Sequence, residues 1–156
     1  MAAWIVEAHN FAQKKEIAEI TLPNKPGYER IVMGGLAALA KNFGFPLSRI
    51  EDLKTAVAEA CLNAMQHGNR EKPEARVLVT VNFQNGILRV SVFDEGAGLT
   101  HEPKDPDIVR IMDNIDPPVG FGVFLMKRLM DGVEFRKIAS QRHEVRMMMK
   151  LDVAQA

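Results

Sequence analysis

The sequence has a single cysteine, Cys61, so neither an intrachain disulfide nor a zinc site built from several cysteines can form. It also lacks an excess of either charge, because 20 basic residues balance 20 acidic ones. A general nucleic-acid binder is usually basic, since contacts with the phosphate backbone dominate its affinity. We therefore expect no nucleic-acid partner.

Long apolar runs are missing as well. No stretch is long enough to span a bilayer, and residues 1–10 lack the basic start and apolar run of a signal peptide. We therefore expect a cytoplasmic protein with no membrane contact. Its 156 residues, 47% hydrophobic and 26% charged, suit one soluble globular domain over 1–156.

The first segment with helical periodicity is 26–43. Pro26 suits a first helical turn, and Gly44 is placed to end the helix. The predicted apolar stripe consists of Ile31, Leu36, Leu39 and Phe43.

The second helical segment begins near Ser48 and ends near Gly68. Ser48 and Glu51 form a predicted capping box at its start. Its apolar residues recur at the helical period. They are Leu53, Ala56, Val57, Ala60 and Ala64.

Strand periodicity appears on both sides of these helices. Asn85-Gly86 is a strong hairpin signal between two alternating runs. The predicted strands are 15–22, 77–83, 88–92, 133–137 and 145–151, with a short helix over 122–130. The order predicts an α+β fold, a two-layer α/β sandwich with helices on one face of a mixed, mainly antiparallel sheet.

Three polar residues of the second helix are spaced four apart, namely Glu59, Asn63 and His67. Successive members rotate by only about 40° around a helix of 3.6 residues per turn, so they form one line. The line drifts into the apolar stripe, which predicts partial burial of Asn63 and His67. A buried amide needs hydrogen-bond partners. Taken alone, the three residues also fit a loop cap, a helix end and a solvated glutamate.

Two glycine-rich turns follow. Asp94-Glu95-Gly96-Ala97-Gly98 comes directly after a strand, where an aspartate can accept a hydrogen bond from an exocyclic amine or form an Asx turn. Gly120-Phe121-Gly122 precedes a helix, whose first N–H groups attract phosphate. Between them lies a long irregular stretch, typical of a functional lid or a disordered segment.

Together and in this order, the three elements resemble the GHKL superfamily, which shares the Bergerat ATP-binding fold. The N box corresponds to 59–63, and the two glycine boxes to 94–98 and 120–122. The segments 57–68 and 122–131 resemble the anti-sigma factor serine-protein kinases of bacteria within that superfamily. The resemblance covers roughly 15–151.

The resemblance implies ATP and Mg²⁺ as cofactors. Asn63 would be the magnesium ligand, because Mg²⁺ prefers oxygen ligands and keeps several waters. Glu59 would be the general base for an incoming hydroxyl, and His67 would support the nucleotide site.

The nucleotide base and phosphates are assigned by the same resemblance. Asp94 would bind the adenine amine, and a lid would span roughly 96–120. Glycines that shape the base pocket or let the lid and helix approach the phosphates are Gly96, Gly98, Gly120 and Gly122.

The implied function is an anti-sigma factor with ATP-dependent serine/threonine-protein kinase activity toward an anti-anti-sigma (STAS-domain) partner. Its partners would be that protein and a sigma factor, and homodimers occur often in the family. Two alternatives stay open. One is a non-catalytic module that binds ATP or ADP and sequesters a protein, and the other is a kinase in a partner-switching pathway without a sigma client.

Overall fold

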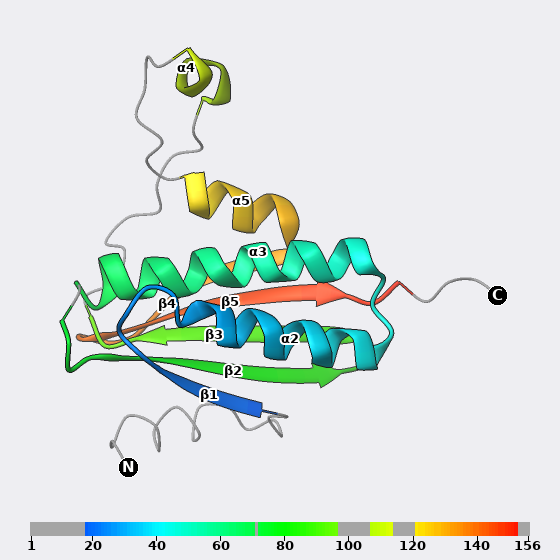
Figure 1. Cartoon of the computed structure of the whole chain (residues 1–156), viewed down its shortest axis with the longest axis horizontal. Coiled ribbons are helices and arrows are strands. Elements are labelled where there is room, and N and C mark those ends of the chain that lie inside the picture. Colours follow the sequence, from blue (N-terminus) through cyan, green and yellow to red (C-terminus); the bar gives the residue numbers. More distant parts are fainter. Residues whose placement is uncertain (1–17, 71, 97–106, 114–120, 153–156) are drawn as a thin grey trace.

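The computed structural model describes residues 18–70, 72–96, 107–113 and 121–152, and they form an α+β sandwich (Figure 1). The strands are β1 (Ala18–Pro23), β2 (Arg76–Gln84), β3 (Ile87–Asp94), β4 (Gly132–Ala139) and β5 (Arg142–Lys150). The helices are α2 (Glu29–Phe43), α3 (Leu47–Asn63), the π-helical turn η1 (Ala64–Gly68), α4 (Ile108–Met112) and α5 (Phe121–Leu129).

The five strands form one sheet in the order β1-β2-β3-β5-β4. Every pairing between these described strands is antiparallel, so no parallel pair of the expected mixed sheet is seen among them. Helices α2 and α3 pack against each other across one face, and α5 packs on α3 (Figure 1). The predicted two-layer architecture is therefore confirmed.

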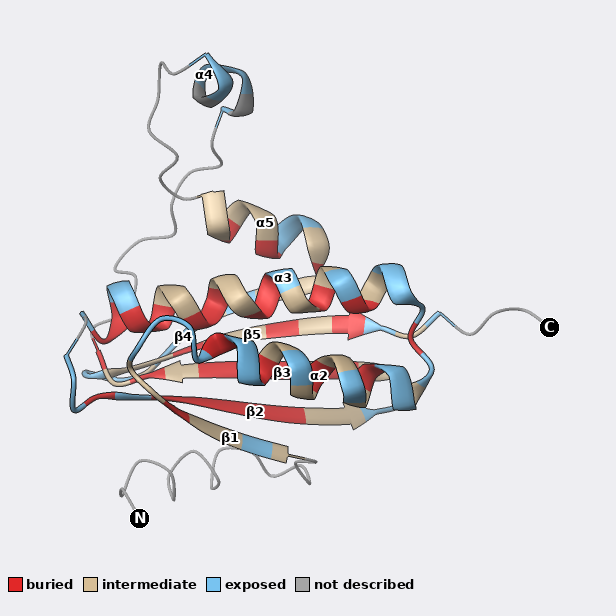
Figure 2. Ribbon diagram, viewed as in Figure 1, coloured by how far each residue is buried: buried red, intermediate tan, exposed pale blue. Residues whose placement is uncertain are grey.

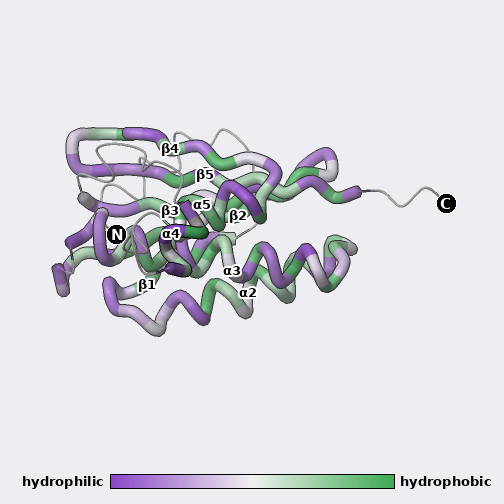
Figure 3. The backbone as a smooth tube through the Cα atoms, turned by 90° about the horizontal axis from the view of Figure 1, so that it is seen from above, coloured by the Kyte–Doolittle hydropathy of each residue, from purple (hydrophilic) through white to green (hydrophobic). Residues whose placement is uncertain are grey.

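The core lies between this helical layer and the inward face of the sheet (Figure 2). Cross-strand partners such as Val79 and Val92, or Val90 and Met147, continue one apolar face from strand to strand. Burying apolar side chains supplies the main driving force for such a layer. Seen from above, α2 and α3 alternate between hydrophilic and hydrophobic stretches, as amphipathic helices do (Figure 3).

Two turn predictions are confirmed in detail. Asn85 and Gly86 have φ angles of 53° and 72°, the pair of positive values that a two-residue hairpin of the favoured type needs. Gly44 ends α2 in the left-handed conformation at φ 95°, with its N–H bonded to carbonyl oxygens of the last turn.

The predicted start of the first helix is wrong by three residues, because α2 begins at Glu29 rather than Pro26. Gly27 has a φ of 106°, which interrupts a right-handed helix at that point. Its N–H instead donates to Oε2 of Glu29 at 2.5 Å.

The predicted stripe of this helix is also displaced. Ile31 is 55% exposed, whereas Val32, Leu36 and Ala40 are fully buried at intervals of four. Leu36 thus belongs to the core as expected. The buried stripe runs through Val32, Leu36 and Ala40, and Ile31 lies outside it.

The predicted capping box of the second helix is wrong as well. Helix α3 begins at Leu47, and Pro46, in an extended conformation, precedes it without a side-chain cap. Ser48 therefore lies inside the first turn. The carbonyl of Pro46 accepts hydrogen bonds from the N–H groups of Arg49 and Ile50 at 3.0 and 3.1 Å.

Between β3 and α5 the structure describes residues 95–96 and 107–113, and the second range contains the short helix α4. The remaining residues of the predicted lid, 97–106 and 114–120, lie outside the described residues. None of the described helices combines the length and the apolar character that crossing a membrane would require.

Leu53→Ala tests the core assigned to α3. Leu53 is fully buried, so we expect the variant to lose roughly 2–5 kcal/mol of unfolding free energy, as large-to-small core changes do. Leu47→Ala is the matched control, because Leu47 is 72% exposed on the same helix and should change stability by less than about 0.5 kcal/mol. Urea unfolding measures both, and equal losses would contradict this packing.

Candidate functional site

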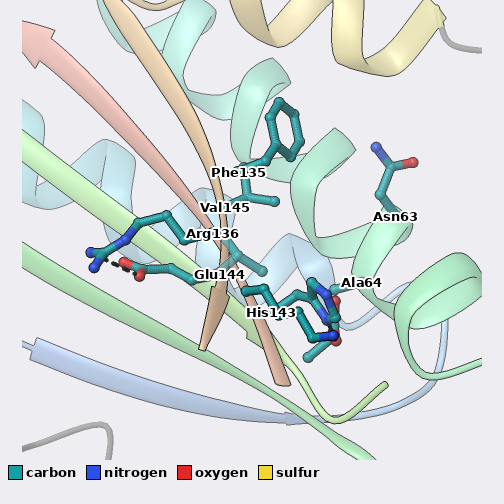
Figure 4. Close-up of a pocket in the computed structure, with 10 residues that line it drawn as sticks. Asn63, Ala64, Phe135, Arg136, His143, Glu144 and Val145 are labelled. Atoms are coloured by element: carbon teal, nitrogen blue, oxygen red, sulfur yellow. Dashed lines mark ion pairs between the residues drawn. The ribbon is translucent and has the colours of Figure 1, made fainter. Parts of the chain in front are cut away.

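A cavity of about 320 Å³ lies between the C-terminal end of α3 and strands β3, β4 and β5 (Figure 4). This volume falls in the range of small-molecule sites. The lining residues are Asn63, Ala64, Val92, Asp94, Phe135, Arg136, Lys137, His143, Glu144 and Val145. Two residues of the sequence prediction, Asn63 and Asp94, therefore line one cavity.

Asp94 ends β3 and is buried, with 7% of its surface exposed. Burial raises the pKa of its carboxyl group, and hydrogen bonds from the N–H groups of Gly96 and His143 act in the opposite direction, as His143 also does whenever its ring is protonated. The Gly96 N–H donates to Oδ1 at 2.9 Å, which is the Asx turn that the sequence also allowed. A perturbed acid in a cavity is typical of a functional group.

Two glycines let the backbone close around this carboxylate. A Cβ atom at Gly68 would collide with the side chain of Asp94, and one at Gly96 would collide with the carbonyl group of Gly68. The turn after β3 therefore packs directly on the end of η1. Only glycine permits so close an approach of two backbones.

Asn69, which the sequence analysis did not single out, fixes this contact. It is 1% exposed, and its Oδ1 accepts the N–H of Glu95 at 2.6 Å. Its Nδ2 donates to the carbonyl of Arg76 at 3.0 Å and to Oδ1 of Asn24 at 3.2 Å. The buried Asn69 amide thus joins the end of η1 to the start of β2 and to the turn after Asp94. These contacts also satisfy the hydrogen-bonding groups of the amide.

The polar line of α3 meets the start of α5. A Cβ atom at Gly122 would lie 2.5 Å from Oε2 of Glu59 and 3.6 Å from Nδ2 of Asn63. Both side chains are half-buried there. The structure thus brings Glu59, Asn63 and Gly122 together, with Asn63 shared between this junction and the cavity.

His67 is exposed, so its predicted partial burial is wrong. The helix changes from α to π geometry at Ala64, shown by the hydrogen bond from the Asn69 N–H to the Ala64 carbonyl at 2.7 Å. A π-helical turn holds more residues than an α-helical one. The line from Glu59 to Asn63 is therefore not continued by His67, and His67 does not line the cavity.

Gly98 and Gly120 lie outside the described residues. The sequence analysis also missed His143 and Lys137 as cavity residues, although Phe135 and Val145 were predicted strand positions. The signal was present, because His143 continues the alternation of Val145 toward the start of β5. What the sequence did not give was the register that sets His143 opposite Asp94.

Cys61 takes no part in this site. It is buried in α3, and burial, with the nearby charge of Glu29, raises the pKa of its thiol to about 12. A thiol that stays protonated is a poor nucleophile.

This arrangement is that of a histidine kinase-like ATPase domain, and the model of that family matches residues 22–149. The chain belongs to this family. Serine-protein kinase RsbW of Bacillus subtilis is 34% identical over 120 residues, covering 74% of this chain and 74% of that protein. Serine-protein kinase RsbW of Listeria innocua is 31% identical over 119 residues, covering 74% and 76%. Within the family, the chain therefore belongs with the serine-protein kinases related to RsbW.

Solved structures share the fold at lower identity. The RsbU and RsbW domains of a Mycobacterium tuberculosis protein match with a TM-score of 0.62 and 18% identity, over 88% of this chain and 33% of that one. This chain thus spans a third of that protein's length. The SiaB–SiaC complex of Pseudomonas aeruginosa matches with a TM-score of 0.61 and 13% identity, over 94% and 96%.

Asp94→Asn tests the electrostatics of the cavity. The raised pKa means that the native state holds the Asp94 proton more tightly than the unfolded chain does. Ionised Asp94 therefore costs stability above the raised pKa, and the cost disappears below the ordinary value of about 3.9. We expect the variant to unfold at a higher temperature than the native protein at pH 7, without nucleotide, and the difference to shrink toward pH 4.

Thermal unfolding at several pH values measures this difference. Asp113→Asn is the control, because Asp113 is exposed and the change should leave the unfolding temperature unaltered. A variant at Asp94 that is less stable than the native protein at pH 7 would contradict the assignment.

Proposed function

We propose that the chain is an ATP-dependent serine/threonine-protein kinase that phosphorylates a STAS-domain anti-anti-sigma partner and binds a sigma factor in the cytoplasm. The observation that carries the proposal is the meeting of Glu59, Asn63 and Gly122 beside the cavity that Asp94 closes. A base, a metal ligand and an adenine acceptor are thereby arranged along one path. Membership of a family of serine-protein kinases supports the same reading.

The cavity would hold the adenine ring. Val92 and Val145 offer apolar surface, and the Asp94 carboxylate is an acceptor for the exocyclic amine. Gly96 would shape this end of the pocket indirectly, because its missing Cβ atom lets the turn after Asp94 pack on the Gly68 carbonyl. Apolar surface combined with placed polar groups is typical of small-molecule sites.

Asn63 fits the role of a single protein ligand to Mg²⁺. It lines the cavity from α3, and its carboxamide oxygen is a hard ligand atom of the kind that Mg²⁺ prefers. Among the described residues, no cluster of three His, Cys, Asp or Glu side chains could hold a metal ion. Phosphate oxygens and water would therefore supply the remaining ligands, and the ion would neutralise charge on the phosphates.

Glu59 would act on the incoming hydroxyl. It lies one helical turn before Asn63, on the side of α3 that faces Gly122. Glu59 would take the proton of the serine or threonine hydroxyl. At the same time the hydroxyl oxygen would bond to the γ-phosphorus of ATP, and ADP would depart. Phosphoryl transfer depends mainly on positioning and on charge stabilisation, so one placed base is sufficient.

Glu59 favours a kinase over a non-catalytic nucleotide switch, because a module that only binds has no need of a carboxylate at this junction. A kinase with a STAS-type partner but no sigma client has the same site. A stable complex with a sigma factor would separate the two pathways.

Asn63→Ala tests the nucleotide site. The variant loses the proposed metal ligand, so we expect the affinity for ATP in the presence of Mg²⁺ to fall at least about tenfold, the effect of about 1.4 kcal/mol. Titration calorimetry measures it. Asn42→Ala, at an exposed position of α2, should bind like the native protein. Unchanged affinity of the Asn63 variant would remove the assignment of this site.

Glu59→Ala tests catalysis separately from binding. We expect ATP affinity to be retained and phosphorylation of a STAS-domain protein to fall by about 10²–10⁴-fold, the usual contribution of a general base. Transfer of labelled phosphate measures it. Glu51→Ala, an exposed change on the same helix, should leave transfer intact. Labelling at the native rate with the Glu59 variant would refute the base.

A further inference from the structure

His143 occupies a position in the cavity that the proposed function has not used. It lies at the start of β5, opposite Asp94 in the register of β3 and β5. Its side chain is 14% exposed and lines the cavity together with Asn63 and Val145 (Figure 4). The ring is therefore held inside the site rather than on the surface.

One ring nitrogen of His143 is already engaged. Nδ1 lies 3.0 Å from the carbonyl oxygen of Gly96. Because a carbonyl oxygen only accepts, Nδ1 must carry the hydrogen of this bond. In the neutral imidazole the second nitrogen, Nε2, is then a hydrogen-bond acceptor. Within the part of the chain that the structure describes, no hydrogen bond of Nε2 is seen.

Asp94 is the second acceptor at this end of the cavity. Its Oδ1 lies 3.9 Å from Nδ1 of His143 and already accepts the Gly96 N–H. The two side chains thus lie side by side, and ionised Asp94 and neutral His143 together present acceptors only. A ligand group that satisfies both must carry two hydrogens.

Purine bases differ in this property at position 6. The exocyclic amine of adenine carries two hydrogens, whereas the oxo group of hypoxanthine or guanine is an acceptor. An oxo group carries no hydrogen for either acceptor, and the neighbouring N1–H of a 6-oxopurine can pair with only one of them. The other buried acceptor is left unpaired, which costs more than a hydrogen bond gains. Sites built in this way reject the wrong analogue strongly.

We propose that His143 is a specificity-determining residue that, with Asp94, accepts the two amine hydrogens of adenine and excludes 6-oxopurine nucleotides. The proposal rests on the proposed function, because it requires the base to occupy this cavity. It adds a second acceptor to the one that Asp94 supplies.

Two substitutions separate the two ends of the ring. His143→Asn can keep a donor near Nδ1 for the Gly96 carbonyl but has nothing at the place of Nε2. His143→Gln can place its amide oxygen, an acceptor, near Nε2. If His143 only positioned the Gly96 turn, His143→Asn would preserve nucleotide preference better than His143→Gln. If His143 contacts the base, His143→Gln would preserve it better.

The experiment measures the affinities of ATP and ITP, with Mg²⁺, for the native protein and the variants. We expect the native protein to prefer ATP and His143→Asn to lose about tenfold of that preference, the effect of one hydrogen bond. His143→Gln should retain most of it. Lys150→Gln, at the exposed far end of β5, is the control and should keep the native ratio. Thermal unfolding confirms that each variant is folded.

The ratio of the two affinities decides the outcome, because a loosened pocket would weaken both nucleotides alike. An unchanged ATP-to-ITP ratio in both His143 variants, or a native protein that binds the two equally, would overturn the role of His143 and leave ATP binding intact. A native protein that binds neither nucleotide would overturn the proposed function as well.

Discussion

The buried carboxylate of Asp94 is the group on which the arrangement of the cavity depends. A carboxylate loses hydration when it is buried, so the surrounding chain must supply donors without filling the space in front of it. The N–H of Gly96 supplies one donor, and the absence of a Cβ atom at Gly68 and Gly96 lets two backbones meet beside it. Asn69 then fastens this contact to the neighbouring strand. Burial of the Asp94 carboxylate thus costs stability at a site where the proposed nucleotide binding requires a polar group.

Helix α3 links this cavity to the rest of the molecule. Its apolar residues pack on the sheet and on α2, while its polar line meets α5 through Gly122. The change to π geometry at Ala64–Gly68 ends the polar line and brings Gly68 against Asp94. Single π-helical turns are frequently found at functional sites. Here that turn joins the face that bears Asn63 to the end of the central strand.

Much of this could be predicted from the amino-acid sequence, because it depends on local rules. The positive φ angles of Asn85 and Gly86 and the left-handed Gly44 follow from which residues tolerate such conformations. The strand alternation identified the inward face that holds Val79 and Val92. The order of the polar line and glycine turns indicated the family, which the comparisons confirm. The roles of Glu59, Asn63 and Asp94 remain predictions.

The sequence by itself therefore determined most of the elements, the core face of the sheet, the two-layer sandwich with a mainly antiparallel sheet, and the family. Tertiary structure decided which residues of different elements contact one another. Sequence periodicity shows which residues share one face of a helix or strand, but it does not show which other element packs against that face. The register of β3 and β5, for example, sets His143 opposite Asp94. The π-helical turn leaves His67 exposed, since it forms where the helix end packs on the Asp94 turn rather than where a local motif requires it.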